Sequence, residues 1–425
     1  MNTNRFSTKI TLLLVSTLTV MAGATIAPAL PSLQAHFSEV KNVGLWIRLV
    51  LTLPGLFIVL AAPVAGYLLD RGSRLRLLVP AMLLYGIAGS SGLYLDSVGS
   101  ILAGRALLGV AVAGIMTSAT TLIADYYEGP ARSRFMGWQA AFMNLGGVIF
   151  LTSGGGLAEL GWRWPFAIYL LAILMIPLVF TALGDPEKPT VKKEFSKTEN
   201  NGKAKAGFSP LLIFIYGVAF GGMIIFYFIP VHIPFYLEKL TGAGPTISGM
   251  AIALATFCST VTAFSYGRIR NRLGYLSILA LTFGLMGIGY LLIALGNSYP
   301  VVLTGLSVGG LGMGLMFPNL NVWLTTEVPA AVRGRAVGGF TTAVFLGQFI
   351  SPVAGQPIVD LFGIGKLFGI AGIFLLNISL AVIVWKKPIL DFTRQVKQRE
   401  VKQDTVTETV SVKTKSQKNG IFLKR

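Results

Sequence analysis

Charged side chains that could do chemistry are few in this chain, and most stand at the ends of apolar stretches. The acids Asp70, Asp125, Glu159 and Asp360 each close such a stretch, whereas Arg105 falls inside one. An arginine in an apolar stretch is costly unless it faces water or a partner, so it can bind an acid or an anionic group. These residues indicate ion pairing and not bond-making catalysis.

Side chains suited to metal or nucleotide chemistry do not cluster. Cys258 is the only cysteine, and the two histidines, His36 and His232, are isolated, so no zinc site is expected. No phosphate-binding G-x-x-x-x-G-K-S/T segment and no nucleophile elbow occurs. We predict that the protein is not an enzyme, needs no metal or cofactor, and draws on a proton gradient in place of ATP.

Long apolar stretches account for most of the sequence. The chain is 53% hydrophobic and 12% charged, whereas soluble domains carry about 25% charged residues. A bilayer core needs about 20 apolar residues per helix, and the backbone there must be helical because no water can satisfy it. We predict an all-α polytopic membrane protein with twelve transmembrane helices at 10–31, 43–69, 77–95, 100–124, 135–158, 164–183, 209–237, 247–267, 275–295, 301–325, 335–359 and 366–385.

Basic residues explain the net charge of +18 without nucleic acid. If the N-terminus is cytoplasmic, 29 of the 35 Lys and Arg residues fall in cytoplasmic segments, as the positive-inside rule requires. We therefore predict a multi-pass protein of the cell (inner or plasma) membrane with both termini in the cytoplasm. Its partners would be the lipid bilayer and a small-molecule substrate, and the N-terminal run would stay as the first span.

Polar segments divide the chain into four parts. We predict an N-terminal six-helix bundle at 1–183, a cytoplasmic linker at 184–208, a C-terminal six-helix bundle at 209–386 and a disordered basic tail at 387–425. A shift of 201 residues superimposes landmarks of the two bundles, which indicates a duplicated unit. The matched pairs are Gly66 and Gly267, Arg71 and Arg272, Arg134 and Arg335, Gly137 and Gly338, Gly146 and Gly347, and Glu159 and Asp360.

The loop after the second stretch carries the most specific motif. It reads Gly66-Tyr-Leu-Leu-Asp70-Arg71-Gly72-Ser73-Arg74-Leu75-Arg76. This resembles the loop 2–3 signature of the major facilitator superfamily, G-x-x-x-D-R/K-x-G-R/K-R/K. The arginines could bridge to helix C-termini or to Asp125 as a latch that holds the outward-open state, or could serve only as a positive-inside anchor. The second copy has Asn271 in place of the acid, so its latch should be weaker.

Two further segments carry partial matches to the same family. Arg105 and Gly109 lie in a segment similar to the superfamily's span-4 motif. In proton-coupled relatives the corresponding arginine is implicated in proton handling, and an anionic substrate group could use it equally well. The alternative, which we favour less, is that Arg105 only extends its charged group to the membrane surface. Gly137, Gly146, Gly154 and Gly155 fit four positions of the span-5 motif associated with antiporters, without its central Gly-Pro. With Gly66, these glycines are expected to pack helices closely.

Resemblance to the family places the substrate cavity between spans 1, 4, 7 and 10, with contributions from spans 5, 8 and 11. Candidate cavity residues are Arg105, Gln139, Asn144, Tyr227, Phe317, Asn319, Asn321 and Trp323. Each polar member could instead only join helix to helix. No acid lies deep in a span, so the candidates for proton coupling and gating are Asp70, Arg71, Arg74, Arg105 and Asp125. His232 is expected near the outer face as an interfacial residue.

The combined pattern predicts a function in transport. The chain resembles the 12-span drug:proton antiporter branch, which implies two pseudo-symmetric bundles that rock about a midplane cavity. We expect a monomeric secondary active transporter that exports a small organic or amphipathic solute against proton flow. The alternative is a proton-coupled uptake symporter or a uniporter for a small metabolite. A membrane sensor or lipid-modifying enzyme is a third class, for which the sequence supplies no chemistry.

Overall fold

Helices form all the regular structure in the part of the chain that is described, which comprises residues 5–184, 210–329 and 332–384 of a computed structural model. Twelve helical segments are long and apolar enough to cross a membrane, which confirms the predicted spans. In chain order they are α1 (Phe6–Ala24) with η1 (Ala27–Ala29) and α2 (Leu30–His36); α3 (Val43–Arg71); α4 (Arg74–Gly89) with η2 (Ser90–Leu93); α5 (Val98–Tyr126); α6 (Gly129–Glu159); η3 (Trp164–Leu170) with α7 (Leu171–Leu174) and α8 (Ile176–Ala182); α9 (Pro210–Thr241); α10 (Pro245–Arg270); α11 (Tyr275–Leu295); α12 (Tyr299–Glu327); α13 (Arg333–Phe362); and the span Ile364–Val384.

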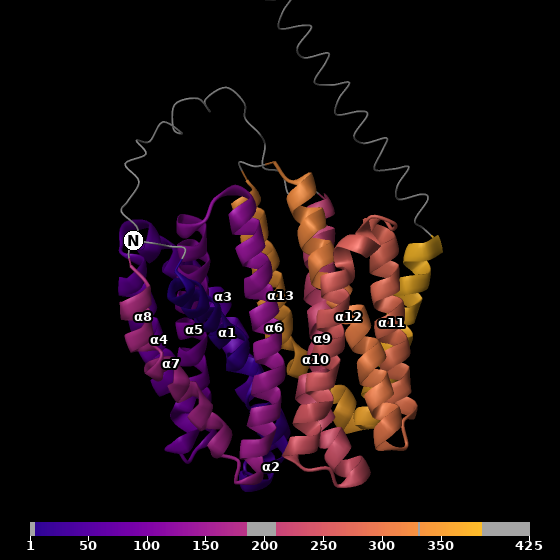
Figure 1. The fold of residues 1–425 in the computed structure, drawn as a ribbon. Coiled ribbons are helices and arrows are strands. Elements are labelled where there is room, and N and C mark those ends of the chain that lie inside the picture. The colour runs from indigo at the N-terminus through magenta and orange to yellow at the C-terminus, as the bar shows by residue number, and fades with distance from the viewer. Residues whose placement is uncertain (1–4, 185–209, 330–331, 385–425) are drawn as a thin grey trace, which may run out of the picture.

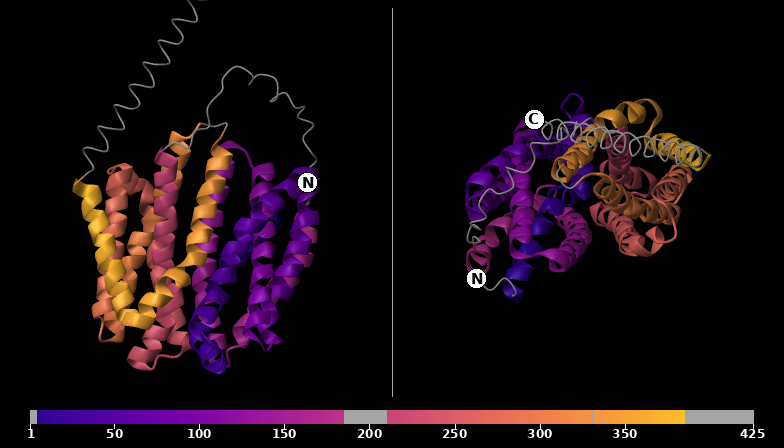
Figure 2. Two further views of the ribbon diagram at one scale, coloured as in Figure 1. Left: turned by 180° about the vertical axis from the view of Figure 1, so that it is seen from behind. Right: turned by 90° about the horizontal axis from the view of Figure 1, so that it is seen from above.

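The twelve spans form two neighbouring six-helix bundles, coloured indigo to magenta and pink to yellow in Figures 1 and 2. The spans alternate in direction along the chain. The starts of spans 1 and 7 and the ends of spans 6 and 12 therefore lie on the same face of the molecule. We call this the terminal face; it is uppermost in Figure 1. The other end, which carries α2, is the opposite face.

Contacts inside the two bundles repeat at the same 201-residue offset as the sequence landmarks. A Cβ atom at position 109 would lie 2.5 Å from the carbonyl oxygen of Pro54, and one at position 310 would collide with the carbonyl oxygen of Ala255. Glycine at both places lets two backbones touch. The shared geometry shows that the bundles are pseudo-symmetric copies.

Span 1 is interrupted beside its prolines. Helix α1 ends at Ala24, and a 3₁₀ turn that contains Pro28 joins it to α2. Pro28 has no N–H to continue the helical hydrogen-bond pattern. The Tyr169 hydroxyl donates to the carbonyl oxygen of Ala22 at 2.9 Å, and the Thr25 hydroxyl donates to that of Met21 at 2.9 Å. The break in the helix is therefore held by polar contacts from within the N-terminal bundle.

Candidate functional site

Contacts between the two bundles are confined to one end of the molecule. Near the opposite face, a Cβ at position 155 would lie 2.7 Å from the Pro245 carbonyl oxygen, and the Glu159 carboxylate accepts from the backbone N–H of Thr246 at 3.2 Å. Contact continues inward as far as Gly55, where a Cβ would lie 2.8 Å from the Phe345 carbonyl oxygen. The closure therefore reaches from the opposite face to mid-membrane.

Towards the terminal face the same helices separate. No neighbouring atom lies within 4 Å of the Cβ position of Gly66, Gly137, Gly267 or Gly338, which are two pairs of the 201-residue repeat. In the described residues, no side-chain hydrogen bond or ion pair joins the bundles in this half of the molecule. The observed conformation is thus closed at the opposite face only.

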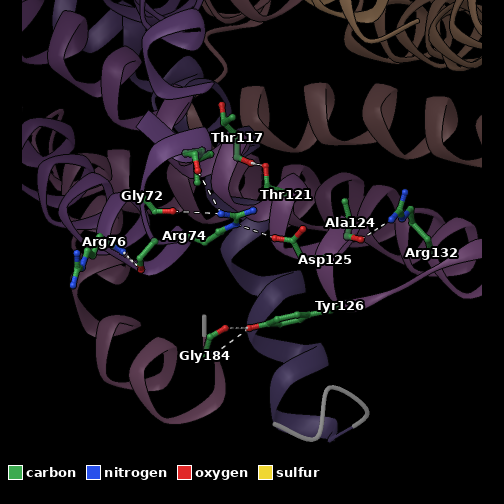
Figure 3. A network of polar contacts seen from close by, with 12 residues as sticks. Gly72, Arg74, Arg76, Thr117, Thr121, Ala124, Asp125, Tyr126, Arg132 and Gly184 are labelled. Carbon is green, nitrogen blue, oxygen red and sulfur yellow. Dashed lines mark hydrogen bonds and ion pairs between the residues drawn. The ribbon is translucent and has the colours of Figure 1, made fainter. Parts of the chain in front are cut away.

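The charged loop after span 2 forms a network within the N-terminal bundle (Figure 3). Arg74 Nε donates to Asp125 Oδ2 at 2.9 Å, which ties the loop between α3 and α4 to the end of α5. Arg74 Nη1 also reaches the carbonyl oxygens of Leu69 and Gly72, at 3.4 and 3.3 Å. The side chains of the pair are 21% and 25% exposed, and such accessible pairs contribute less than about 1 kcal/mol. The pair is therefore weak enough to break during a conformational change.

The other members of the predicted latch do not join this network. The guanidinium of Arg71 lies 4.2 Å from the centroid of the Tyr67 ring. The exposed Asp70 makes no hydrogen bond or ion pair to a described residue. The neighbouring C-terminus of α5 is capped instead by Arg132, whose Nη2 and Nε donate to the carbonyl oxygens of Ala124 and Tyr127 at 2.6 and 2.9 Å. In this state only Arg74 and Asp125 are brought together.

Arg105 is fully buried inside the N-terminal bundle. Its guanidinium donates to the carbonyl oxygen of Gly89 and lies 4.8 and 4.7 Å from the ring centroids of Phe166 and Tyr169. Its Nε and Nη1 have no hydrogen-bond partner in the described structure. Arg105 and Asp125 are twenty residues apart on one straight helix, about 30 Å, so they cannot exchange a proton directly.

The remaining predicted cavity residues fall into two groups. One group joins helices: Gln139 donates to the Ser16 hydroxyl at 3.0 Å, the buried Asn319 donates to the Tyr275 carbonyl oxygen at 3.0 Å, and Trp323 stacks on Tyr275 with ring centroids 5.2 Å apart. The other group makes no side-chain hydrogen bond in the described structure. It comprises the half-buried Asn144, Tyr227 and Phe317 and the exposed Asn321.

Four of the six predicted packing glycines lie against neighbouring helices. Besides Gly109 and Gly155, position 146 faces Thr17, with a Cβ distance of 3.1 Å, and position 154 faces the Thr25 backbone. The other two, Gly66 and Gly137, face open space. Among these six glycines, the four packed ones lie between mid-membrane and the opposite face, and the two open ones lie near the terminal face.

One pair of polar residues was missed by the sequence reasoning. Arg48 and His232 are 4% and 0% exposed, and Arg48 Nε donates to His232 Nδ1 at 3.2 Å across the bundle interface. Arg48 lies five residues after the start of α3, and its position inside an apolar stretch was the signal available. No group of three or more metal-ligating side chains exists among the described residues.

Comparison with known proteins identifies the class to which this architecture belongs. The sequence profile of the Major Facilitator Superfamily matches residues 12–243 and 231–416, so the chain belongs to this family of membrane transporters. Its family and fold are those of transporters and not of enzymes.

Particular relatives are distant. The chain is 22% identical to the bacillibactin exporter of Bacillus subtilis (strain 168), over 78% of this chain and 85% of the relative. It is 24% identical to the multidrug efflux pump SdrM of Staphylococcus aureus (strain N315), over 75% and 82%. A crystal structure of a bacterial homologue of the human lysosomal transporter Spinster, in an inward-facing and unoccupied conformation, matches with a TM-score of 0.71 at 17% identity, covering 88% and 95% of the two chains.

Proposed function

We propose that this transporter exports a small amphipathic organic solute in exchange for protons, by alternating access. The observation that carries the proposal is the confinement of inter-bundle contacts to the opposite face. Two pseudo-symmetric bundles that touch at one end are in one of the two states that rocking requires. Relatives named as exporters and multidrug efflux pumps support the outward direction.

The terminal face is proposed to be cytoplasmic. Most basic residues of the described segments, including Arg74 and Arg132 of the network in Figure 3, lie at this end of the spans, in accord with the positive-inside rule. The observed conformation would then be inward-facing, in a cell membrane, with both termini inside. We propose that the protein works as a monomer and that the bundles are the units bounded at 1–183 and 209–386; the predicted linker and tail lie almost entirely outside the described residues.

We assign solute contact to the candidate cavity residues whose side chains make no hydrogen bond to another helix. Asn144, Tyr227, Phe317 and Asn321 are at least partly accessible and make no side-chain hydrogen bond in the described part of the chain. Two amides, a phenol and an aromatic ring suit an amphipathic molecule, which needs apolar contact with a few polar anchors. Asp125, with its weak partner Arg74, remains the proposed proton-responsive pair at the terminal face.

Everted membrane vesicles from cells that express the protein test the proposal. With an acidified lumen, a fluorescent lipophilic cation such as ethidium should accumulate, and its addition should dissipate the proton gradient. Vesicles without the protein are the control. Accumulation that is unchanged when nigericin collapses the pH gradient would refute proton coupling.

An uptake symporter or uniporter is the second candidate. It is favoured by the absence of Gly-Pro in span 5, where Phe150 and Leu151 stand instead. Such a protein would load right-side-out vesicles and would not fill everted ones against a gradient. A panel of toxic compounds and secreted metabolites, applied to cells with and without the gene, would identify the solute in either case.

A further inference from the structure

Arg48 and His232 form the one hydrogen bond between two side chains that joins the bundles in the described part of the structure. Arg48 comes from α3 of the N-terminal bundle and His232 from α9 of the C-terminal bundle. Arg48 Nη1 donates to the Gly44 carbonyl oxygen at 2.6 Å, and its guanidinium lies 4.3 Å from the ring centroid of Phe235. Gly44 therefore holds the arginine from its own bundle, while Phe235 and His232 contact it from α9 of the other bundle.

This bond requires a neutral imidazole. Arg48 Nε is a donor, so His232 Nδ1 must accept with a free lone pair, and the single ring proton must sit on Nε2. His232 Nε2 is buried and has no hydrogen-bond partner among the described residues. A second ring proton on Nδ1 would remove the acceptor and place two cations in contact away from water. The closed opposite face is thus compatible with only one protonation state of His232.

A pocket at the opposite face reaches Arg48, and Arg48 separates it from the fully buried His232. The pocket, of about 700 Å³, lies between α2, α3 and α13 and is lined by Gln34, Arg48, Gln356 and Asp360 together with apolar residues. Gln356 Nε2 donates to Asp360 Oδ1 at 2.6 Å. The groups that face the Arg48–His232 contact are therefore the Asp360 carboxylate from α13, the amide of Gln34 from α2, and the rings of Phe228 and Phe235 from α9 itself.

We propose that His232 is a proton-binding site that controls closure of the opposite face. When Arg48 turns towards Asp360 and the pocket, its Nε leaves His232 Nδ1, and a hydronium ion from pocket water transfers a proton to that nitrogen. One O–H bond of the hydronium ion breaks, one N–H bond forms on the imidazole, and a water molecule is left. Because the closed state excludes the charged imidazole, acid shifts the equilibrium towards separation of the bundles at this face. The inference goes beyond export and holds whatever solute is moved.

A buried reporter tests the proposal directly. Thr52 is fully buried one helical turn from Arg48, so Thr52→Cys in a Cys258→Ser background should react with a membrane-impermeant thiosulfonate only when the opposite face opens. The labelling rate is normalised to Leu160→Cys, an exposed position on the same face at 70%. If one proton controls opening, the normalised rate should be nearly constant above about pH 7 and should rise by up to about tenfold per pH unit below about pH 6.5, where a water-exposed imidazole takes up a proton.

Matched variants make the test specific. His232→Gln keeps an acceptor for Arg48 but cannot become charged, so its labelling should stay slow at every pH. His36→Gln is the matched control, because His36 packs on Phe37 and Trp162 of its own bundle, and its pH response should equal that of the parent. An acid response that persists in His232→Gln, or a parent rate that does not change with pH, would overturn the proposal.

NMR spectroscopy of the protein with isotope-labelled histidine tests the proposal even if His232→Gln does not fold. The protein has only two histidines, so the ring signals are assigned by His36→Gln alone. His232 should protonate over the same pH range in which the reporter opens; a ring that stays neutral while labelling rises would contradict the proposal. No transported solute is required, so absent transport with an intact pH response counts against the export function alone.

Discussion

The two bundles make the same contacts with different chemistry. At the terminal face of the N-terminal bundle, Arg74 pairs with Asp125. The residues 201 positions further on are Tyr275 and Thr326, and the Tyr275 hydroxyl donates to the Thr326 hydroxyl at 3.3 Å. The duplicated backbone brings the same two sites together, but only one copy carries charge. Geometry is therefore shared between the copies, whereas electrostatic response is concentrated in the N-terminal one.

The buried centres of the two bundles also differ in charge, which again is present only in the N-terminal bundle. The N-terminal bundle has Arg105 over the ring of Tyr169, which in turn packs against the ring of Tyr85. The corresponding position in the C-terminal bundle is Leu306, which is also fully buried. There Tyr290 keeps its hydrogen bond to a span-7 carbonyl oxygen, that of Ile225, at 2.7 Å. A folded bundle of this kind thus does not need a central cation, which points to a functional reason for Arg105.

The largest effect on stability is expected when the buried residues at the two bundle centres, Arg105 and Leu306, are exchanged. Leu306→Arg places a cation where no partner exists and should cost about 3 kcal/mol or more. Arg105→Leu should keep a folded protein, because the C-terminal bundle already tolerates leucine there. Thermal unfolding in detergent measures both. A strong loss of stability in Arg105→Leu would show that the cation is structural and would remove the contrast.

A smaller loss of stability, equal in the two bundles, is expected from substitutions at the paired glycines Gly109 and Gly310. Gly109→Val and Gly310→Val each push a side chain into a neighbouring backbone carbonyl, and overpacking of this kind costs about 1–3 kcal/mol. The two unfolding midpoints should fall by similar amounts. Gly99→Val, at an open position, serves as the control. Unequal losses would mean that the pseudo-symmetry does not extend to packing energy.

The terminal-face pairs should differ modestly in stability and clearly in transport. Asp125→Asn should change the free energy of unfolding by less than about 1 kcal/mol, since the pair is partly exposed, but should reduce proton-linked export. Thr326→Val should leave export unchanged. Vesicle assays on the two variants measure the difference. Equal export by both variants would argue that the charge is only a topological anchor.

No loss of stability in the observed state is expected from substitutions at the open glycines. Gly66→Val and Gly338→Val meet no neighbour here, apart from the small intrinsic effects of replacing glycine. Closure at the terminal face would bring these helices together, so both variants should slow turnover while unfolding normally. Wild-type turnover in both would mean that the two positions stay apart throughout the cycle.

Sequence periodicity and composition were sufficient for the twelve spans and for the duplicated unit, because long apolar runs leave the backbone only one structure. Asp125 could also be found as a partner for the span-2 loop, since both occupy span ends on one face. The rotation of each helix about its axis is not readable from a run that is apolar all round. Asn319 therefore looked like a cavity residue, although it binds the backbone of Tyr275.

The Arg48–His232 contact is a second feature that the sequence alone could not predict. Both residues could be placed near the opposite face, but nothing in the sequence states that α3 of one bundle meets α9 of the other at that depth. Only tertiary packing decides whether a polar side chain near a span end reaches water or a partner. The most informative residues for gating were therefore the ones with the least distinctive motifs.

The contacts that close the opposite face differ between the α6–α10 side and the α3–α13 side, and this difference predicts how the face opens. Between α6 and α10 the chains touch backbone to backbone, and Glu159 binds the start of α10. Between α3 and α13 the related acid, Asp360, borders the pocket instead. We expect this face to separate first along α3 and α13, beside the pocket, while α6 and α10 stay in contact longest.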